Sequence, residues 1–445
     1  MDVWALYRQK LCTAQEAVQL VKNGDWVDYS QSAAFPEALD EALAARRGEL
    51  KDVKVRSGIA LKPVQVVEQD PDQQSFTYHV WHCSAIDRGY ADRGLAFPVP
   101  MLFRDCGSYY TRGFAPVNVA MISVPPMDRD GNFNFSMMNG LTQEILDSAD
   151  RVILEVCEDM PVVYGMACDH IHISQVDAVV EGGRSVGTAG SPPPKEIDRQ
   201  IAANIFPYLQ DGITLQIGIG GMPNALGSLI AQSDLKDIGI HTEMLSDGYL
   251  ALCRAGKITN RKKEIDRGKG VFSVGAGSKE LYEFLDRNMD LMSAPMRYVN
   301  DPMTIRQFSR FVSINGCVSM DLYGQVCSES SGTRQISGTG GQLDFVTGAY
   351  MSEHGKAFLA MPSVFTDRQG QRRSRIFPKF TQGDIITTPR AQAPYMVTEY
   401  GVACLPGLSV WQRAEAIINI AHPDFREELI RAAQEQGIWR RSSRR

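Results

Sequence analysis

Short apolar runs alternate with helical segments along most of the chain. The runs are too short for helices, and turns rich in glycine, proline and aspartate separate them from segments in which apolar residues recur at helical spacing. Strands that alternate with helices predict parallel sheets, because each helix crosses over between two parallel strands. The sequence therefore predicts an α/β protein. The expected strands are residues 26–29, 118–123, 151–156, 213–219, 238–240, 271–275, 311–315, 357–361 and 395–398, and the longer expected helices are residues 37–47, 141–149, 279–286, 411–420 and 424–434.

Two parts of the chain share one order of elements. In the first part, a helical segment leads through Gly24 to a strand and then to Pro36, which opens a helix. In the second part, residues 201–210 lead in the same way through Gly212 and a strand to Pro223. The spacing from glycine to proline is 12 residues in the first part (36 − 24) and 11 in the second (223 − 212). We interpret this similarity as an internal duplication, although the same order of elements also occurs in unrelated α/β proteins.

The length of the chain predicts more than one domain. At 445 residues the chain exceeds one ordinary hydrophobic core, so two domains of roughly 200 residues are expected. Residues 182–197 are a run of glycine, proline and small residues, which is typical of a linker. We therefore predict two similar open α/β domains, residues 1–185 and 201–445, joined by a linker at residues 186–200.

The charge and hydropathy of the chain argue against two classes of partner. A net charge of −6 and a pI near 5.7 do not suit a nucleic-acid-binding protein, whose affinity rests on a basic face. The basic clusters at residues 261–263, 372–375 and 440–445 are typical of solvated surface. No run approaches the about 18 apolar residues of a membrane-spanning helix, and the N-terminus lacks the pattern of a signal peptide. We expect neither nucleic acid nor membrane as a partner.

The cysteines indicate a reducing compartment. There are nine of them, an odd number, and they are scattered without a Cys-x-x-Cys pair. In a long chain this pattern favours free thiols over a disulfide framework. The sequence therefore predicts a cytoplasmic protein.

A glycine turn follows the expected strand at residues 213–219. It reads Gly-Ile-Gly-Gly at residues 218–221, and a helical pattern that includes Pro223 follows. Glycines at a strand end let a ligand touch the backbone, and their amides with a helix N-terminus favour negative charge. The turn lacks the spacing of a dinucleotide site and the Lys-Ser/Thr of a Walker loop, so we hypothesise an anionic or thioester ligand. Residues 338–341 form a second glycine cluster, whereas residues 32–34 of the first related part read Ser-Ala-Ala.

Glu243 is the candidate nucleophile. It follows the expected strand at residues 238–240 and lies 25 residues after Gly218 (243 − 218). Neighbouring strand ends share one crevice in an open α/β sheet, so Glu243 and the glycine turn are expected to meet. A desolvated carboxylate can attack a thioester. Backbone amides can then stabilise the oxyanion, and each such donor typically lowers the activation barrier by about 3–4 kcal/mol. The alternative is an ordinary surface or helix-capping carboxylate.

The chain also contains two metal-like patterns and two hairpin signals. Residues 128–132 lack the glycine position and the bidentate glutamate of a calcium loop. His170 and His172 lie on one face of a short strand, but partners for a zinc site are missing, so structural histidines are favoured and no metal is expected. Asp130-Gly131 predicts a hairpin between the runs that flank it, and Tyr323-Gly324 predicts a second one.

Four ordered motifs resemble one family. GIGGMPNAL at 218–226, IHTEMLSDG at 240–248, SGTGGQLDF at 337–345 and EYGVACLPG at 399–407 are similar to the acetyl-CoA hydrolase/transferase family, the class I coenzyme A transferases. The resemblance covers nearly the whole chain and is greatest to the butyryl-CoA:acetate, 4-hydroxybutyrate and itaconate CoA-transferases. It implies CoA transfer between an acyl-CoA, such as acetyl-, butyryl- or succinyl-CoA, and a short acid, such as butyrate, 4-hydroxybutyrate or itaconate.

The resemblance also implies a site and a mechanism. Two similar α/β domains would enclose the active site, and Glu243 would react in a ping-pong cycle through a glutamyl-CoA thioester. CoA is then a substrate, no cofactor stays bound, and a homo-oligomer is expected. Residues 113–116 and 123–126 are candidates for the wall that faces the acyl group. The CoA contacts that the resemblance implies are Gly218, Ile219, Gly220, Gly221, Met222, Asn315, Gly338, Gly340, Gly341 and Lys356, of which Lys356 could equally be a surface lysine.

Two other functions remain open at this stage. A hydrolase on the same scaffold would use water instead of a second acid to resolve the glutamyl intermediate. A non-catalytic sensor of CoA or a sugar phosphate would use the same α/β units without Glu243 chemistry. The sequence does not identify the acid, because no motif maps onto the acyl-facing residues.

Overall fold

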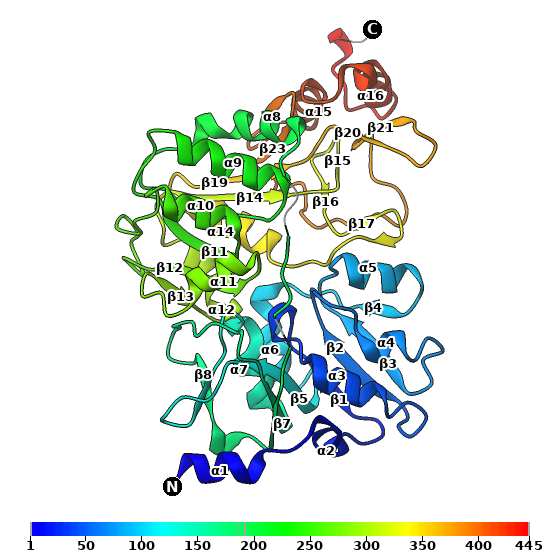
Figure 1. Cartoon of the computed structure of the whole chain (residues 1–445). Helices are drawn as coiled ribbons and strands as arrows, with labels where there is room; N and C mark the ends of the chain where they lie inside the picture. The colour runs from blue at the N-terminus through cyan, green and yellow to red at the C-terminus, as the bar shows by residue number, and fades with distance from the viewer. Residues whose placement is uncertain (1, 185, 191–192, 444–445) are drawn as a thin grey trace.

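Each half of the chain contains one large sheet in the computed structural model, which describes residues 2–184, 186–190 and 193–443 (Figure 1). The strand order is β4-β3-β2-β1-β5-β7-β9 in the first sheet and β13-β12-β11-β10-β14-β19-β23-β24 in the second. Neighbouring strands are parallel, except that β24 is antiparallel to β23 at one edge. The predicted fold class, α/β with two similar open sheets, is confirmed. The strands are β1 (Trp26–Asp28), β2 (Val53–Ser57), β3 (Phe76–Val80), β4 (Ala96–Pro98), β5 (Val117–Val124), β7 (Ala149–Val156), β9 (Ala178–Glu181), β10 (Thr214–Ile217), β11 (Gly239–Leu245), β12 (Gly270–Gly275), β13 (Leu291–Ser293), β14 (Phe311–Gly316), β19 (Lys356–Ala360), β23 (Tyr395–Thr398) and β24 (Gly401–Cys404).

The two sheets follow the same path. In each sheet the chain starts near the centre, at β1 or β10, and adds strands on one side as far as β4 or β13. It then returns to the other side, with β5, β7 and β9 in the first sheet and β14, β19 and β23 in the second. This correspondence agrees with the predicted internal duplication. The path reverses beside β1 and beside β10, and such switch points are where open α/β sheets bind ligands.

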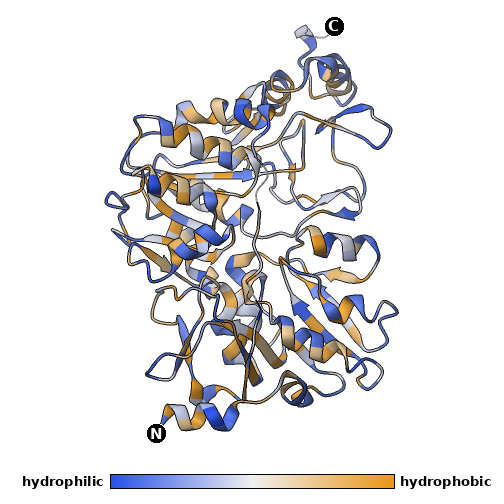
Figure 2. Ribbon diagram, in the orientation of Figure 1, coloured by the Kyte–Doolittle hydropathy of each residue, from blue (hydrophilic) through white to orange (hydrophobic). Residues whose placement is uncertain are grey.

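The two halves pack together through helices. Figure 1 places α6 and α7 of the first half beside α12 of the second, and these helices are in contact. Met138 and Leu141 of the first half belong to the same hydrophobic core as Val274 and Met296 of the second. Figure 2 shows apolar residues along the strands of both sheets and polar residues in many of the outer loops. The α-helices are α1 (Val3–Lys10), α2 (Ala14–Ala17), α3 (Glu37–Ala44), α4 (Gln65–Glu68), α5 (Ala85–Asp92), α6 (Phe103–Thr111), α7 (Asn139–Ser148), α8 (Glu196–Ile205), α9 (Gly221–Gln232), α10 (Asp247–Arg254), α11 (Lys279–Leu285), α12 (Met296–Val299), α13 (Pro302–Ile305), α14 (Gln342–Met351), α15 (Val410–Asn419) and α16 (Pro423–Glu435).

The smaller sheets test the two hairpin predictions. The hairpin expected at Asp130-Gly131 is wrong, because β6 (Asn132–Asn134) pairs with β8 (His170–His172) instead of with β5. Asp130-Gly131 forms a local turn in which the Gly131 N–H donates to the carbonyl of Asp128 at 3.2 Å. The hairpin expected around Gly324 is confirmed by the antiparallel pair β15 (Ser319–Asp321) and β16 (Val326–Cys327). The remaining short strands are β17 (Ser330–Ser331), β18 (Arg334–Gln335), β20 (Val364–Thr366), β21 (Arg372–Ser374) and β22 (Ile376–Phe377).

Residues 186–190, between β9 and α8, run along the second half. The Ala189 N–H donates to the Gly277 carbonyl at 3.0 Å, and the Tyr282 hydroxyl donates to the Gly187 carbonyl at 2.8 Å. Residues 185, 191 and 192 of the expected linker lie outside the described residues. The exact limits of the two domains stay a prediction.

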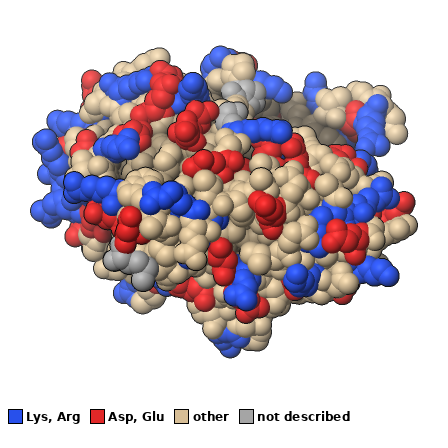
Figure 3. Space-filling view, turned by 60° about the horizontal axis from the view of Figure 1, so that its bottom comes forward, with Lys and Arg blue, Asp and Glu red and all other residues tan. Residues whose placement is uncertain are grey.

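The surface carries both signs of charge. Lysine and arginine are interspersed with aspartate and glutamate over the face that Figure 3 shows, which suits a net charge of −6. Within the described part of the chain, no helix is long and apolar enough to cross a membrane.

Candidate active site

A cavity of about 560 Å³ lies between the two halves of the molecule. The second half lines it with the carboxyl ends of β10, β11 and β14 and with the start of α14. The first half lines it with the segment after β2 and with the start of α5. The carboxyl ends of parallel strands meet at one edge of a sheet, so this cavity occupies the switch point of the second sheet. The lining residues include Ile59, Ala60, Leu61, His82, Arg88, Gln216, Gly218, Ile219, Glu243, Met244, Asn315, Gly341 and Phe345.

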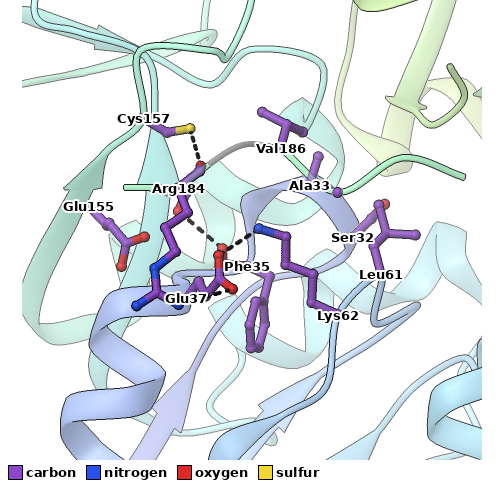
Figure 4. A pocket seen from close by; sticks show the side chains of 12 residues that line it. Ser32, Ala33, Phe35, Glu37, Leu61, Lys62, Glu155, Cys157, Arg184 and Val186 are labelled. Atoms are coloured by element: carbon purple, nitrogen blue, oxygen red, sulfur yellow. Dashed lines mark hydrogen bonds and ion pairs between the residues drawn. The ribbon is translucent and has the colours of Figure 1, made fainter. Parts of the chain in front are cut away.

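The corresponding crevice of the first sheet is nearly filled (Figure 4). Its volume is about 20 Å³, which is room for a single water molecule. Lys62 pairs with Glu37 at 2.6 Å, and the Cys157 thiol donates to the carbonyl of Arg184 at 2.8 Å, which closes the segment after β9 over the crevice. Glu155 accepts the Leu39 N–H at 3.0 Å at the start of α3. Of these two crevices, the one in the second sheet is therefore the one with room for a ligand.

Glu243 lies inside a strand, which differs from the sequence-based expectation. The strand was expected to end at residue 240, but β11 continues to Leu245. The reason is its neighbour β12, which pairs with β11 from His241 opposite Val271 to Leu245 opposite Gly275. The strand pairing therefore fixes the backbone of Glu243 while its side chain lines the cavity.

The carboxylate of Glu243 is held by two donors. The side-chain amide of Asn300 donates to Oε2 at 2.7 Å, and the backbone N–H of Gly341 also donates to the carboxylate. Burial raises the pKa of Glu243 to about 7, and these two hydrogen bonds oppose that rise. Near neutral pH the side chain is thus a weakly solvated carboxylate in equilibrium with its acid form. Such a carboxylate is more nucleophilic than one in water.

The glycine turn after β10 divides into two parts. Gly218 and Ile219 line the cavity, and Ile219 is 56% exposed. Gly220 has a φ of +118°, a conformation that other residues rarely adopt. A side chain at Gly221 would overlap the carboxylate of Asp198 on α8, and Met222 packs in the core. Gly218 and Ile219 are therefore in place to touch a ligand, whereas Gly220, Gly221 and Met222 shape the turn and the start of α9.

The second glycine cluster brings the two halves into contact. A side chain at Gly338 would overlap the backbone carbonyl of Trp81 in the first half. Gly340 has a φ of +58°, forms a parallel bridge with Leu102, and accepts the Phe103 N–H at 3.3 Å. A side chain at Gly341 would overlap the carboxylate of Glu243. Gly341 is the member of this cluster that reaches the cavity, and the other two allow close approach of the first half.

The structure brings Asn315 to the cavity but does not bring Lys356 there. Asn315 lies near the end of β14, where its amide donates to Ser313 Oγ at 2.9 Å. Lys356 is the first residue of β19 and pairs with Val312, at the start of β14. The two ends of a parallel sheet point to opposite edges, so Lys356 lies at the edge away from Glu243. A contact between Lys356 and CoA in this cavity is not supported.

The first-half wall also differs from the expected one. Ser123 lines the filled crevice of the first sheet, Pro126 lines surface grooves elsewhere, and Phe114 is 65% exposed. The segments at residues 113–116 and 123–126 therefore do not line the cavity. The wall instead comes from residues 59–61 and from the segment that starts at His82. No glycine cluster or family motif marks these residues, which explains why the sequence did not single them out.

Asn300 and Asp344 are functional candidates that sequence reasoning missed. Asn300 follows α12 and is fully buried, and Asp344 is a fully buried residue in the first turn of α14. Asp344 is part of SGTGGQLDF, and that motif was a signal that could have found it. Asn300 belongs to no such pattern, because only the packing of α12 against β11 brings it to Glu243.

The histidine pair has local partners. His170 Nδ1 hydrogen-bonds Asp169 at 2.7 Å, and His172 Nδ1 hydrogen-bonds Ser174 at 2.8 Å. Within residues 2–184, 186–190 and 193–443, no group of three or more His, Cys, Asp and Glu side chains could hold a metal ion. These contacts support structural roles for both histidines.

Comparison with known proteins gives full-length relatives. Family models described as the N-terminal and C-terminal domains of acetyl-CoA hydrolase/transferase match residues 1–187 and 277–433, and Glu243 lies between these ranges. The butyryl-CoA:acetate CoA-transferase of Anaerostipes caccae is 46% identical over 440 residues, 98% of this chain and 99% of that protein. The 4-hydroxybutyrate coenzyme A transferase of Clostridium kluyveri is 37% identical over 97% of this chain and 98% of that protein. The crystal structure of RipA from Yersinia pestis has a TM-score of 0.90 at 36% identity and covers 98% of this chain and 100% of that one.

Replacement of Gly341 by alanine tests the geometry around Glu243. The new side chain would overlap the carboxylate of Glu243 and the amide of Asn300, so the carboxylate must move. We expect acyl-CoA turnover to fall on the order of 100-fold, because a small displacement of a reacting group costs about that much. Gly316→Ala is the matched control, since that glycine ends β14 on the same side of the sheet but faces open space, and its steady-state rate should match wild type. Equal rates for the two variants would contradict the proposed geometry.

Proposed function

Because the chain belongs to the acetyl-CoA hydrolase/transferase family, we propose that it is a CoA-transferase that moves CoA from an acyl-CoA to a short carboxylic acid. The observation that carries this proposal is the carboxylate of Glu243, which lines a cavity between the two halves and is held by Asn300 and Gly341. Acetyl-CoA, butyryl-CoA and succinyl-CoA are the donors to test first. Butyrate, 4-hydroxybutyrate and itaconate are the acids.

The first half-reaction transfers CoA to the enzyme. Asn300 donates to Oε2 of Glu243, which leaves Oε1 to attack the carbonyl carbon of the acyl-CoA. The carbon–sulfur bond breaks, CoA leaves as the thiolate, and Glu243 and the acyl group form a mixed anhydride. The thiolate then attacks the glutamyl carbonyl carbon. The anhydride bond breaks, the donor acid leaves as a carboxylate with one oxygen from Glu243, and a glutamyl-CoA thioester remains.

The second half-reaction reverses these steps with a different acid. The carboxylate of the acceptor attacks the glutamyl carbonyl carbon, the CoA thiolate leaves, and a second anhydride forms. The thiolate attacks the acyl carbon of that anhydride, which releases the new acyl-CoA and restores the carboxylate of Glu243. One thioester replaces another throughout, so the cycle needs no ATP.

The donors that hold Glu243 at rest also serve the reaction. When the thiolate or the acceptor attacks the glutamyl carbon, negative charge develops on the glutamyl oxygen. That oxygen is Oε2, so the Asn300 amide is already in place to stabilise it, and the Gly341 N–H, which donates to the same carboxylate, is a second donor beside it. Each preorganised donor of this kind is worth about 3 kcal/mol in the transition state.

The wall of the cavity favours transfer over hydrolysis. Ile59, Leu61, Ile86, Met244 and Phe345 give the cavity an apolar lining, which disfavours water near the glutamyl intermediate. Among the described residues of the lining, Arg88 alone carries a permanent positive charge. Its Nε donates to the carbonyl of Ile336 at 2.8 Å, and we assign its guanidinium to an anionic group of the substrate.

Two further expectations concern the cellular form of the protein. All nine cysteines are free, which supports a reducing compartment such as the cytoplasm. A homo-oligomer is expected because closed homo-oligomers are common among soluble enzymes.

An exchange assay separates transfer from hydrolysis. With acetyl-CoA as donor, we expect butyryl-CoA to form in the presence of butyrate, with little free CoA released in its absence. The products are measured by chromatography of the CoA esters together with a thiol assay. Release of free thiol at the same rate with and without acceptor would contradict the transferase and indicate a hydrolase. Absence of both activities in the wild type would support a non-catalytic sensor.

The dependence of the rate on pH tests the state of Glu243. The nucleophile is the carboxylate, and burial raises its pKa to about 7, so kcat/KM should fall about tenfold per pH unit below that pH. The same raised pKa lowers stability as pH rises from the unfolded value of 4.5 through 7, since ionisation is disfavoured in the folded protein. Glu243→Gln should abolish transfer, because the nucleophile is lost. The melting temperature of the variant should be higher than that of wild type at pH 8, where wild-type Glu243 is ionised, but not at pH 4. A kcat/KM profile that stays flat down to pH 5 would refute this assignment.

A further inference from the structure

Glu243 has a second carboxylate beside it, and one amide joins the two. The Nδ2 of Asn300 donates to Oε2 of Glu243 at 2.7 Å and to Oδ2 of Asp344 at 3.5 Å. Asp344 and Asn300 are both fully buried. Two like charges that share one buried donor are unfavourable, so a pair of this kind tends to keep one proton.

The first half of the molecule holds Asp344 in this place. The backbone N–H of Arg104 donates to Oδ2 of Asp344 at 3.1 Å, and the guanidinium of Arg104 lies 3.2 Å from Oδ1. Arg104 is in the first turn of α6, and the bridge from Leu102 to Gly340 ties the same segment to the glycine cluster. The environment of Asp344 therefore depends on the contact between the two halves.

Among the described residues around this pair, two buried acceptor oxygens lack a hydrogen-bond donor. Asn300 gives its amide hydrogens to the two carboxylates, whereas its own oxygen, Oδ1, is buried without a hydrogen-bond donor among the described residues. Oδ1 of Asp344 is also buried and lacks a hydrogen bond of good geometry in the described part of the chain, although Arg104 is near it. An ionised carboxylate can only accept, so neither oxygen gains a donor unless a proton is added. A proton on Asp344 converts one of these acceptors into a donor.

The charged and titratable groups that face Asp344 agree with this assignment. Burial raises the pKa of Asp344 to about 8, Arg104 opposes the rise, and the charge of Glu243 adds to it. Burial also raises the pKa of Glu243, and the shorter bond from Asn300, 2.7 Å to Glu243 against 3.5 Å to Asp344, favours the ionised form of Glu243. Cys106 on α6 faces both carboxylates, and burial together with their charges raises the pKa of its thiol well above the usual value, so it stays neutral.

We propose that Asp344 is a positioning residue that holds the proton of the carboxylate pair, so that Glu243 is the ionised member when acyl-CoA arrives. Arg104 holds the side chain of Asp344 in place from the other half of the molecule, and its charge limits how far the pKa of Asp344 rises. This proposal rests on the proposed role of Glu243 as nucleophile. At higher pH the second proton leaves, and two negative charges compete for the amide of Asn300, which draws Oε2 of Glu243 out of position.

The pH profile of an Asp344→Asn variant tests the proposal. Wild type should show a bell-shaped profile of kcat/KM, with an acidic limb from Glu243 and an alkaline limb from Asp344. Asparagine mimics protonated aspartate, so the variant should keep the acidic limb and move the alkaline limb up by at least one pH unit. Asp105→Asn is the matched control, because Asp105 is next to Arg104 in sequence, at 3.7 Å from its Nε, but exposed to solvent. An alkaline limb at the wild-type pH in Asp344→Asn overturns the proposal.

A second variant covers the case in which Asp344→Asn does not fold. Arg104→Ala removes the cation that favours ionised Asp344, so the alkaline limb should again move to higher pH while the acidic limb stays. A role of Arg104 in packing alone would lower the rate without moving either limb, and that result would count against the proposal.

An infrared measurement separates this proposal from the proposed function. In substrate-free wild type at pH 7, Asp344 should contribute the stretching band of a protonated buried carboxyl, and the difference spectrum between wild type and Asp344→Asn should show the loss of that contribution. Failure of wild type to transfer CoA would contradict the proposed function. The infrared band would still test whether Asp344 holds the proton, because it does not depend on activity. Identical carboxyl bands in wild type and Asp344→Asn would overturn the assignment of the proton to Asp344, whatever the activity of wild type.

Discussion

The site depends on keeping one carboxylate out of water while it stays reactive. A buried carboxylate is unfavourable unless donors compensate it, and the pKa of Glu243 is raised by burial and lowered again by two donors. Each donor comes from a different part of the fold. Asn300 follows α12, and Gly341 precedes α14, in a loop that the first half supports through Leu102. The contact between the two halves is therefore part of the chemistry and does more than bury surface.

The duplicated architecture explains why one crevice serves as the site. Both sheets reverse direction beside their first strand, so both could in principle bind a ligand there. In the first sheet, Ser-Ala-Ala at residues 32–34 forms a buried turn, and Lys62, Glu37 and the segment around Arg184 fill the space. In the second sheet, the glycine turn leaves the space open. The first half has become the wall of the neighbouring site instead of a site of its own.

The sequence predicted secondary-structure elements better than it predicted which distant residues and strands come into contact. Apolar runs and turn residues located the central strands of both sheets, because these signals are local, but they did not mark β3, β4, β9, β13 or β24. The glycine turn was found because it follows the end of β10, and Glu243 was found because it lies close to the carboxyl end of β11. Asn300 and Arg104 were missed because only tertiary packing brings Asn300 to Glu243 and Arg104 to Asp344. Lys356 starts its strand instead of ending it, so the structure places it away from the cavity. The hairpin prediction at Asp130-Gly131 was wrong for a related reason. The turn is present, but the following strand β6 pairs with β8, which begins 38 residues further along the chain (170 − 132).

The central claim is that CoA becomes covalently attached to Glu243. Borohydride reduces a thioester to an alcohol but leaves a carboxylate unchanged, so it converts this intermediate into a permanent mark. The wild-type protein is treated with borohydride in the presence of acetyl-CoA, without an acceptor acid, and its peptides are mapped by mass spectrometry. The account predicts that Glu243 is reduced to the alcohol, and that omission of acetyl-CoA leaves it intact. Reduction at any other carboxylate, or an unmodified Glu243 in a preparation that transfers CoA, would contradict it.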